Sequence, residues 1–250
     1  VIGKGVDLNK MMAELLGKAT GYCKGKGGSM HIADIDSGNL GANGVVGGGH
    51  SLSVGAALTQ QMKKTGKIVL CFFGDGAANE GSFHEALNLA SIWKLPVIFY
   101  CENNLYGMSM SVNKHMNIKD IADRAASYGM PGYVVDGNDA ASLYDKMLEI
   151  TKYVREGNGP VLVESKTYRW LGHSKSDANV YRTKEEIEEW KAKDPIEKFK
   201  NYLIKKKYFN EAELTEIEEK AKEDIEKAVE FSNNSLDPEL ETALTDVYAD

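Results

Sequence analysis

The chain has 250 residues, of which 42% are hydrophobic and 27% charged, and its formal net charge is -7. This composition is ordinary for a globular protein, and the length is sufficient for one large α/β domain with a buried core. The negative charge argues against nucleic acid or an anionic membrane as the main partner. No apolar run reaches the roughly 20 residues of a membrane-spanning helix, and no signal peptide is visible.

Cysteine usage points to a reducing environment. Cys71 and Cys101 lie inside apolar runs, where cysteine usually behaves as a small hydrophobic residue. The chain has no CxxC spacing, so neither a zinc site nor a redox dithiol is expected. We therefore expect a reduced protein with a cytoplasmic location.

Four short apolar runs predict the strands of a sheet. The first is KIVLCFF (67–73), and the others follow Pro96, Pro131 and Pro160. Proline is tolerated at the entry to a strand because its missing N–H is not needed there. The runs are continuous rather than alternating, which is typical of parallel strands covered on both faces.

Helical patterns separate these runs. Apolar residues recur at three- and four-residue spacing over four segments, 51–64, 79–93, 117–128 and 139–156. Alternating strands and helices predict right-handed β-α-β units. The expected fold is therefore α/β, with a mostly parallel sheet and helices on both faces.

The character of the chain changes after residue 168. Residues 168–182 have no useful periodicity, and a loop of this length is either functional or disordered. Capping signals then predict helix starts at Thr183, Asp194 and Thr215, the last helix covering about 215–231. We expect an α/β domain over 1–182, with loop 168–182 over its site, and a helical extension of the same domain over 183–250.

Two strand ends carry the central motif. The first strand runs into Gly74, Asp75 and Gly76, and the next runs into Asn103 and Asn104. Since parallel strands end at the same edge of a sheet, where ligands of α/β folds bind, Asp75 and Asn104 are expected side by side. Carboxylate and amide oxygens suit magnesium, which also keeps positions for phosphate oxygens.

Other interpretations of this motif are weaker. The N–H groups of Ala77 and Ala78, at the start of a helix, are expected to point toward an anion. Asp75 would alternatively serve only as a helix N-cap. A dinucleotide fingerprint would need glycine where Asn79 stands, and a carboxylate in that turn would repel a bare pyrophosphate. No GxxxxGK[ST] sequence is present, so a triphosphate P-loop is not expected.

Residues 74–108, GDGAANEGSFHEALNLASIWKLPVIFYCENNLYGM, resemble the thiamine-diphosphate motif. More narrowly, they resemble the alpha subunit of the first, dehydrogenase component of 2-oxo-acid dehydrogenase complexes, including pyruvate and acetoin dehydrogenases. Three further segments carry the same resemblance: GKGGSMHIAD (25–34), GANGVVGGG (41–49) and YRWLGHSKSDANVYRT (168–183). The resemblance covers about residues 10 to 200.

The resemblance implies roles for individual residues. Asp75 and Asn104 would bind magnesium together with the main-chain carbonyl of Tyr106, and Gly76 and Ala77 would contact the cofactor's diphosphate. The backbone groups of two residues in 41–49 would meet the aminopyrimidine ring of thiamine diphosphate: Gly44 and Val46.

The resemblance also implies roles for loop 168–182. His173 would be the catalytic loop histidine that reaches the phosphate end of the cofactor. Ser174 stands where eukaryotic pyruvate dehydrogenases carry a regulatory phosphoserine. His31 is a candidate near-site residue, and no role is expected for the remaining histidines: His50, His84 and His115.

The implied reaction needs further chains. The substrate would be acetoin or pyruvate, with RWLGHSKSDAN (169–179) slightly favouring acetoin. A two-carbon unit would pass to a lipoyl group on a dihydrolipoyl acetyltransferase component. The cofactor-activating glutamate would come from a beta subunit in an α2β2 heterotetramer, so Glu80 and Glu102 are expected to have surface or salt-bridge roles. A diphosphate-binding arginine would lie upstream of Val1. A nucleotide- or dinucleotide-binding module and a non-catalytic assembly subunit remain as alternatives.

Overall fold

The structure, a computed structural model, describes residues 1–246. They form two compact units, one of residues 1–44 together with the described chain from residue 206 onward, and one of Val45–Lys205. The expected domain boundary at residue 183 stays a prediction. The last four residues of the expected helical extension, 247–250, lie outside the described residues.

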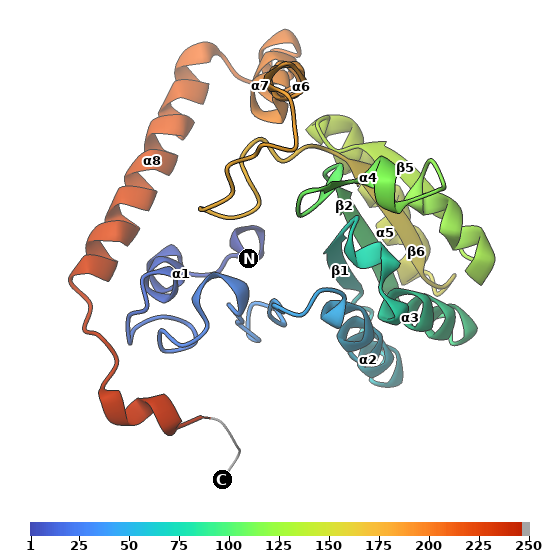
Figure 1. The fold of residues 1–250 in the computed structure, drawn as a ribbon, viewed down its shortest axis with the longest axis horizontal. Helices are drawn as coiled ribbons and strands as arrows, with labels where there is room; N and C mark the ends of the chain where they lie inside the picture. Colours follow the sequence, from blue (N-terminus) through green and yellow to red (C-terminus); the bar gives the residue numbers. More distant parts are fainter. Residues whose placement is uncertain (247–250) are drawn as a thin grey trace. The chain divides into compact units, whose positions relative to one another are not determined.

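The second unit contains a four-stranded sheet in the order β1-β2-β6-β5 (Figure 1). All neighbouring strands are parallel, as the apolar runs predicted. The strands are β1 (Val69–Gly74), β2 (Val97–Asn103), β5 (Gly132–Asp136) and β6 (Val161–Lys166). Strand β2 lies in the middle of the sheet, and six of its seven residues are buried, which explains its continuous apolar sequence.

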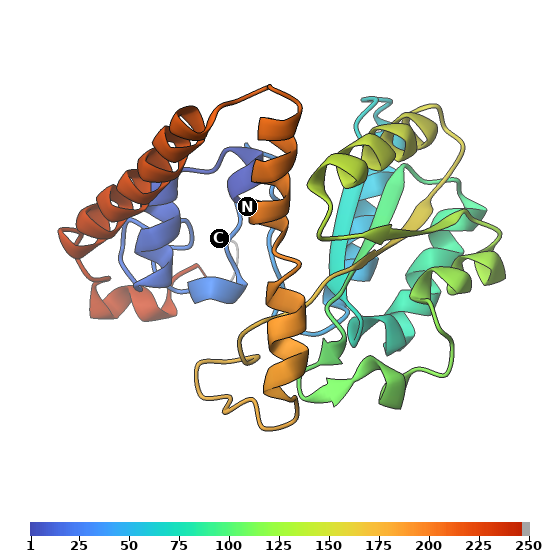
Figure 2. The same cartoon turned by 90° about the horizontal axis from the view of Figure 1, so that it is seen from above.

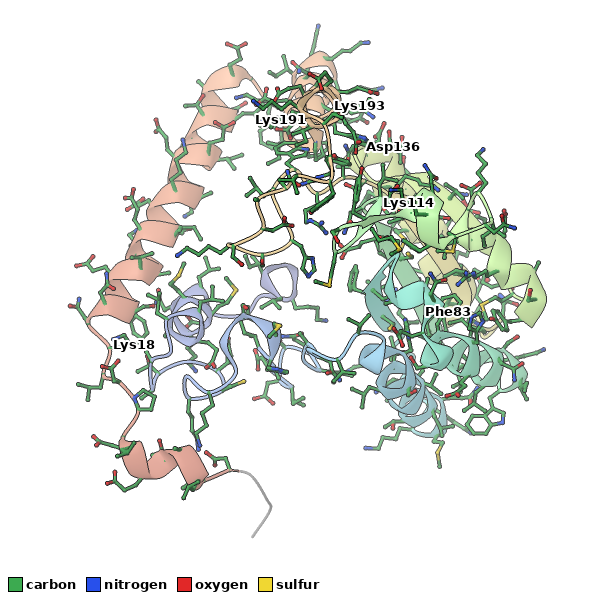
Figure 3. All side chains as sticks on the ribbon, in the orientation of Figure 1. Lys18, Phe83, Lys114, Asp136, Lys191 and Lys193 are labelled. Carbon is green, nitrogen blue, oxygen red and sulfur yellow. The ribbon has the colours of Figure 1, made fainter. Side chains whose placement is uncertain are left out.

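Helices cover both faces of this sheet, which confirms the expected fold class (Figures 1 and 2). Helices α2 (Gly48–Met62) and α3 (Gly81–Ile92) pack on one face, and α5 (Ala140–Arg155) packs on the other. Alternate residues of β2 separate the two cores: Phe99 and Cys101 join the first, whereas Ile98 and Tyr100 join the second. The first core also takes in Phe83, which is labelled in Figure 3.

Short elements connect the strand ends. A 3-10 turn, η3 (Ala77–Asn79), precedes α3. After β2 comes a small antiparallel ribbon of β3 (Tyr106–Gly107) and β4 (Met110–Ser111), followed by the one-turn helix α4 (Val112–His115).

The helix expected over 117–128 is instead the 3-10 helix η4 (Ile121–Tyr128). Gly129 ends it in the left-handed conformation, at φ 65°, as a glycine stop predicts. Its first turn is tied to the sheet, because the Ala122 N–H donates to the buried Glu164 carboxylate at 2.9 Å. In the expected helix over 117–128, the Ala122 N–H would instead bond a carbonyl one turn earlier. The spacing of apolar residues does not predict such a long-range bond to Glu164.

The expected helix starts at Thr183 and Asp194 are confirmed. Helix α6 (Lys184–Lys191) is capped by the Thr183 hydroxyl, which accepts the Glu186 N–H at 3.1 Å. Helix α7 is Pro195–Lys205. The Asp194 carboxylate, just before it, accepts the Ile196 N–H at 2.8 Å.

The expected helix start at Thr215 is wrong. Helix α8 covers Glu211–Asn233 and begins with a capping box formed by Asn210 and Glu213. The Asn210 side chain accepts the Glu213 N–H at 3.0 Å, and the Asn210 N–H donates to the Glu213 carboxylate at 2.8 Å. Thr215 lies inside the helix, where its hydroxyl donates to the Glu211 carbonyl at 2.9 Å. An Asn cap with Glu three residues later satisfies two free N–H groups, which Thr215 cannot do from the second turn.

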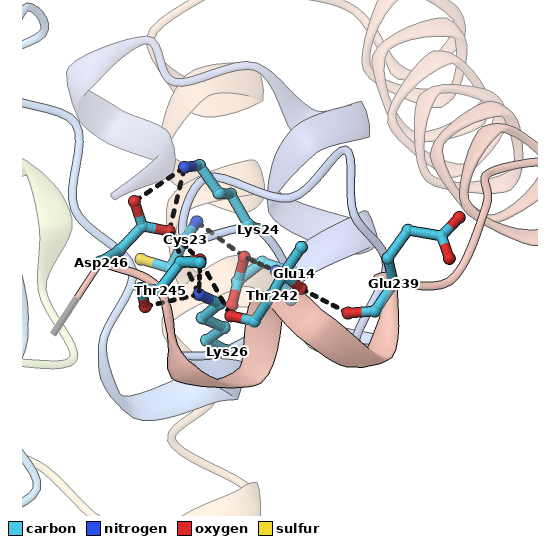
Figure 4. A network of polar contacts seen from close by, with 9 residues as sticks. Glu14, Cys23, Lys24, Lys26, Glu239, Thr242, Thr245 and Asp246 are labelled. Atoms are coloured by element: carbon cyan, nitrogen blue, oxygen red, sulfur yellow. Dashed lines mark hydrogen bonds and ion pairs between the residues drawn. The ribbon is translucent and has the colours of Figure 1, made fainter.

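The first unit is built on α1 (Leu8–Leu15) and α8, which run side by side (Figure 2). Two short 3-10 turns complete its N-terminal part, η1 (Ile2–Lys4) and η2 (Gly28–Met30), and a third, η5 (Leu240–Leu244), follows α8. Lys24 and Lys26 pair with Asp246 at 3.0 and 3.1 Å, which ties the end of the described chain to the segment after α1 (Figure 4).

Candidate active site

The loops after β1 and β2 meet at one edge of the sheet. In the register of the two strands, Gly74 lies opposite Glu102. A methyl group added at Gly107 would lie 3.3 Å from the Gly76 Cα and 3.8 Å from the Asp75 Oδ2. The backbone after β2 therefore approaches the Gly-Asp-Gly turn so closely that only glycine fits at Gly107 without a shift.

Asp75 is almost completely enclosed at this edge, with 1% of its surface exposed. Its Oδ2 lies 3.2 Å from the Nε2 of His115. A carboxylate is rarely buried without a compensating partner, because the charge loses its hydration. The Asp75 side chain caps neither η3 nor α3, whose N-cap residues are Gly76 and Glu80, so the N-cap interpretation finds no support.

Asn104 and Tyr106 belong to a strained turn. Leu105, between them, has a φ of 71°, a conformation that non-glycine residues rarely adopt. The Asn103 side-chain oxygen accepts the Leu105 N–H at 3.1 Å, and the Asn104 side-chain oxygen accepts the Tyr106 N–H at 3.4 Å. The main-chain carbonyl of Tyr106 accepts a bond from Arg169 at 3.3 Å.

Buried Glu164 holds this turn from the neighbouring strand β6. Its carboxylate accepts the Asn103 side-chain N–H at 2.7 Å and pairs with Lys166 at 2.8 Å. Lys166 also pairs with Asp120 at 2.9 Å. Burial alone would lower the pKa of Lys166, but its bonds to Glu164 and Asp120 raise it above the ordinary value.

Glu186 holds the side of the turn away from the sheet. Its carboxylate accepts the hydroxyl protons of Tyr106 at 2.9 Å and Tyr168 at 2.7 Å. Burial, together with the bond to this carboxylate, raises the pKa of Tyr106 to about 12. The turn also lines a cavity of about 760 Å³ together with Lys166 and Trp190.

Hydrogen bonds fold loop 168–182 onto itself. The Asp177 carboxylate accepts the N–H groups of His173 and Asn179 and the hydroxyl of Tyr181, at 2.7 to 2.8 Å. The bonds to His173 and Asn179, followed by that to Tyr181, lower the pKa of Asp177 to about 2. These bonds give the loop a defined conformation, and its role at the site stays a prediction.

Arg182 and Arg169 connect the loop to the rest of the site. Arg182 is 8% exposed, lies over the ring of Tyr106 at 5.4 Å, and donates to the carbonyl of Leu171 at 2.9 Å. Arg169 bonds both the Tyr106 carbonyl at 3.3 Å and His173 Nδ1 at 3.5 Å. His173 is itself exposed, and Arg169 joins it to the turn that carries Asn104.

The remaining predicted residues of the second unit, Ala77 and Val46, lie near the Gly-Asp-Gly turn and the helix that follows it. Ala77 is buried in η3, and the Ala78 N–H donates to the Asp75 carbonyl at 3.3 Å; it therefore does not point toward an anion as expected. Val46 is exposed, but a methyl group on the next residue, Gly47, would lie 2.8 Å from Ser82 at the start of α3. The chain after Val46 therefore touches the helix that follows the Gly-Asp-Gly turn.

Gly44 belongs to the first unit, where it faces the other segment that resembles the family. A methyl group at Gly44 would lie 3.5 Å from His31 Nε2 and 3.9 Å from the end of Met30. Segments 25–34 and 41–49 thus meet at these residues. The places of Gly44 and His31 relative to Asp75 stay predictions.

Three site residues carried no signal of a site role in the sequence. His115 and Glu186 contact the predicted residues Asp75 and Tyr106 from 40 and 80 positions away, and Glu164 contacts Asn103, the neighbour of Asn104, from 61 positions away. His115 and Glu164 belong to no spaced motif, and Glu186 belongs only to the capping signal of Thr183, so only the folded chain brings the three residues to the site. His115 was expected to have no role.

Within residues 1–246 there is no cluster of three or more His, Cys, Asp or Glu side chains that could hold a metal. The expected magnesium donors are one carboxylate, one amide and one main-chain carbonyl, a set of a different kind. Hard oxygen donors around a single buried carboxylate fit magnesium, which completes its coordination with phosphate and water. None of the helices in the described part of the chain is long and apolar enough to cross a membrane.

Comparison with known proteins decides the family. The model of the dehydrogenase E1 component family matches residues 1–241. The chain belongs to this family. It is 53% identical over 248 residues to the alpha subunit of acetoin:2,6-dichlorophenolindophenol oxidoreductase from Bacillus subtilis, covering 99% of this chain and 74% of that protein. The corresponding subunit of Cupriavidus necator is 43% identical, with 99% and 74% covered.

Pyruvate dehydrogenases are also similar to this E1 chain. The E1 component subunit alpha of pyruvate dehydrogenase from Rickettsia bellii is 41% identical over 248 residues, covering 99% of this chain and 76% of that subunit. Family membership agrees with the resemblance drawn from residues 25–34, 41–49, 74–108 and 168–183.

Proposed function

We propose that this chain is the alpha subunit of a thiamine-diphosphate-dependent dehydrogenase that acts on acetoin. The supporting observation is the 53% identity to the Bacillus subtilis acetoin oxidoreductase subunit, compared with 41% to the Rickettsia bellii pyruvate dehydrogenase subunit. The slightly greater resemblance of residues 169–179 to acetoin dehydrogenases points the same way.

The edge of the sheet would hold the cofactor through magnesium. Asp75, Asn104 and the Tyr106 carbonyl supply three oxygen donors on two loops that touch. Arg169, which now bonds that carbonyl, is a flexible side chain and can leave it for an ion. Gly76 and Ala77 would contact the diphosphate from the turn after β1. Gly44 and Val46 would meet the aminopyrimidine through main-chain groups.

Thiamine diphosphate, when bound, supplies a nucleophilic carbon and an electron sink for breaking a carbon–carbon bond. The chain's own residues bind and orient the reactants. Loop 168–182 would cover the site and exclude water, with His173 as the catalytic residue that reaches the phosphate end. Asp177 and Arg182 keep the loop in shape for this task.

Other chains would complete the enzyme. A beta subunit would supply the activating glutamate in an α2β2 heterotetramer, and a dihydrolipoyl acetyltransferase component would receive the product in a cytoplasmic complex. Cleavage between the two oxygenated carbons of acetoin releases acetaldehyde. The other two-carbon unit leaves at the acetyl level, with the lipoyl disulfide accepting two electrons.

The test is reconstitution with the beta subunit and reduction of a dye acceptor. Acetoin should support the faster turnover, the isolated chain should show little or none, and Asp75→Ala or Asn104→Ala should abolish it in the complex. Faster turnover with pyruvate would reassign the substrate. Robust turnover by the isolated chain, or full activity of Asp75→Ala, would refute the division of labour or the site.

Thermal unfolding tests the cofactor class separately. Thiamine diphosphate with magnesium should raise the melting temperature of the reconstituted complex, because a ligand that binds only the folded state stabilises it. NAD or ATP should leave that temperature unchanged. Stabilisation by NAD or ATP alone would support the nucleotide-binding alternative.

A further inference from the structure

His115 is placed against Asp75 by the elements that follow β2. It ends α4, the one-turn helix that also carries Lys114, labelled in Figure 3. Its Nε2 lies 3.2 Å from Asp75 Oδ2, and the two side chains are 11% and 1% exposed. A methyl group at Gly107 would lie 3.7 Å from the same Nε2, so the ribbon after β2 lies beside this pair of side chains.

The neighbours of His115 determine which of its ring nitrogens carries the proton. Arg124 donates to the side-chain oxygen of Asn79 at 2.8 Å, so the Asn79 amide nitrogen must face the other way. That nitrogen donates to His115 Nδ1 at 2.9 Å and to the His115 carbonyl at 3.2 Å. A neutral imidazole that accepts at Nδ1 carries its proton on Nε2. His115 therefore donates to Asp75.

Arg124 is itself held firmly. It donates to the Ala78 carbonyl, and its guanidinium group lies 5.8 Å from the centre of the Phe83 ring. Asn79 and Ala78 belong to η3, directly after the Gly-Asp-Gly turn. Arg124 from η4 and His115 from α4 therefore both bond residues of one short segment, 75–79, and Asn79 links them.

We propose that the hydrogen-bond chain Arg124–Asn79–His115 positions the Asp75 carboxylate for a divalent cation. This inference rests on the proposed function, because it assumes that Asp75 is a ligand. A bond to Oδ2 restricts the rotation of the carboxylate and would leave Oδ1 for the ion. A neutral donor does this without bringing a competing positive charge, and such outer partners typically change metal affinity 10- to 100-fold. His115 is a positioning residue, since it acts through Asp75.

The experiment measures Mn²⁺ binding by electron paramagnetic resonance in the reconstituted complex with thiamine diphosphate. His115→Leu removes the donor, whereas His115→Gln keeps an N–H at nearly the position of Nε2. His84→Leu is the matched control, because His84 bonds the Tyr128 hydroxyl from α3 and touches no predicted ligand. We expect about 10- to 100-fold weaker Mn²⁺ binding for His115→Leu, recovery to within about threefold for His115→Gln, and no change for His84→Leu.

Two outcomes would overturn the inference. Wild-type affinity in His115→Leu would show that the donor does not matter. Equal weakening in His115→Leu and His115→Gln, with melting temperatures unchanged, would show that the imidazole ring acts through its shape rather than its N–H. Asn104→Ala separates this question from the proposed function: if it also leaves Mn²⁺ binding unchanged, the metal site itself is misassigned.

Discussion

Glu14 in the first unit and Glu164 in the second are both fully buried carboxylates, and each shapes a loop of its own unit. Glu14 accepts four main-chain N–H groups, from Cys23, Gly25, Gly27 and Gly28, at 2.7 to 3.0 Å (Figure 4 shows its surroundings). Glu164 instead accepts one main-chain N–H and two side-chain groups, the Asn103 amide and the Lys166 ammonium.

The two carboxylates differ in whether they bond the main chain or the side chains of the loop they hold. Glu14 bonds only main-chain N–H groups of segment 23–28, so it organises this segment whatever the other side chains are, provided that the glycines remain. Gly25 has a φ of 77°, and a methyl group there would lie 2.6 Å from the Gly17 carbonyl. Glu164 acts through Asn103, whose own side chain then fixes the Leu105 N–H. Substituting a side chain of the second loop, such as Asn103, therefore removes some of its bonds. Substituting side chains within segment 23–28 leaves the bonds to Glu14 in place.

The largest expected effect follows from removing Glu14. Glu14→Ala leaves four partly buried N–H groups without their acceptor, and each costs about 1 kcal/mol. We expect the free energy of unfolding of the first unit to fall by about 4 to 5 kcal/mol in denaturant titration. Glu216→Ala, on the surface of α8, is the control. An unfolding midpoint equal to that of the control would mean that Glu14 does not organise segment 23–28.

Glu164→Ala should destabilise the second unit by about 3 kcal/mol, because it breaks a buried ion pair and two further bonds. Combining it with Asn103→Ala sharpens the comparison. Since both substitutions remove the same contact, their combined effect should be smaller than additive, by about 1 to 3 kcal/mol. Asn138→Ala, which also removes a buried asparagine with two bonds, should add independently to Glu164→Ala. Additive losses for Asn103 and Glu164 would contradict the link between them.

His50 gives the second unit a dependence on pH. It is fully buried against Phe73 and Phe83, and this burial lowers the pKa of His50 from 6.5 to about 4. As the pH falls below 6.5, the unfolded chain gains a proton that the folded chain does not, until the pH reaches about 4. The free energy of unfolding should thus fall by about 2 kcal/mol between pH 6.5 and 4.5.

The check is to repeat the titration with His50→Leu. Removing the imidazole should flatten the stability profile between pH 6.5 and 4.5, while leaving stability at pH 8 nearly unchanged or higher. His50 Nε2 has no hydrogen-bond partner among the described residues, so the substitution removes an unsatisfied group. A profile for His50→Leu parallel to that of the unsubstituted chain would assign the pH dependence to other groups.

The smallest effects are expected from substituting the two candidate N-cap residues of α8, Asn210 and Thr215. Asn210→Ala should lower the stability of the first unit by about 1 kcal/mol, because it removes a capping box. Thr215→Ala should change stability by less than about 0.5 kcal/mol, since alanine favours the helix interior and Thr215 caps nothing. Helix content by circular dichroism during thermal unfolding measures both. An equal loss in the two variants would contradict the assigned start of α8.

Most of the sheet and part of the site followed from local sequence. Four apolar runs predicted four parallel strands, and the polar residues after two of them predicted which loops meet. Both predictions succeed because burial on two faces demands continuous apolar sequence, and because parallel strands end at one edge. The predictions of η4 and of the start of α8 were wrong. A long-range bond to Glu164 outweighed the periodicity at η4, and a capping box at Asn210 outweighed the signal at Thr215.

The sequence by itself determined the fold class, the family and the two strand ends whose loops meet, which carry Asp75 and Asn104, because each rests on a pattern of neighbouring residues. Only the tertiary structure decided what holds them: His115 beside Asp75, Glu164 beneath Asn103, and Arg169 on the Tyr106 carbonyl. Those partners come from 40 to 63 residues away. A hydrogen bond depends on distance and angle in space, and those are set only when the strands, helices and loops have packed.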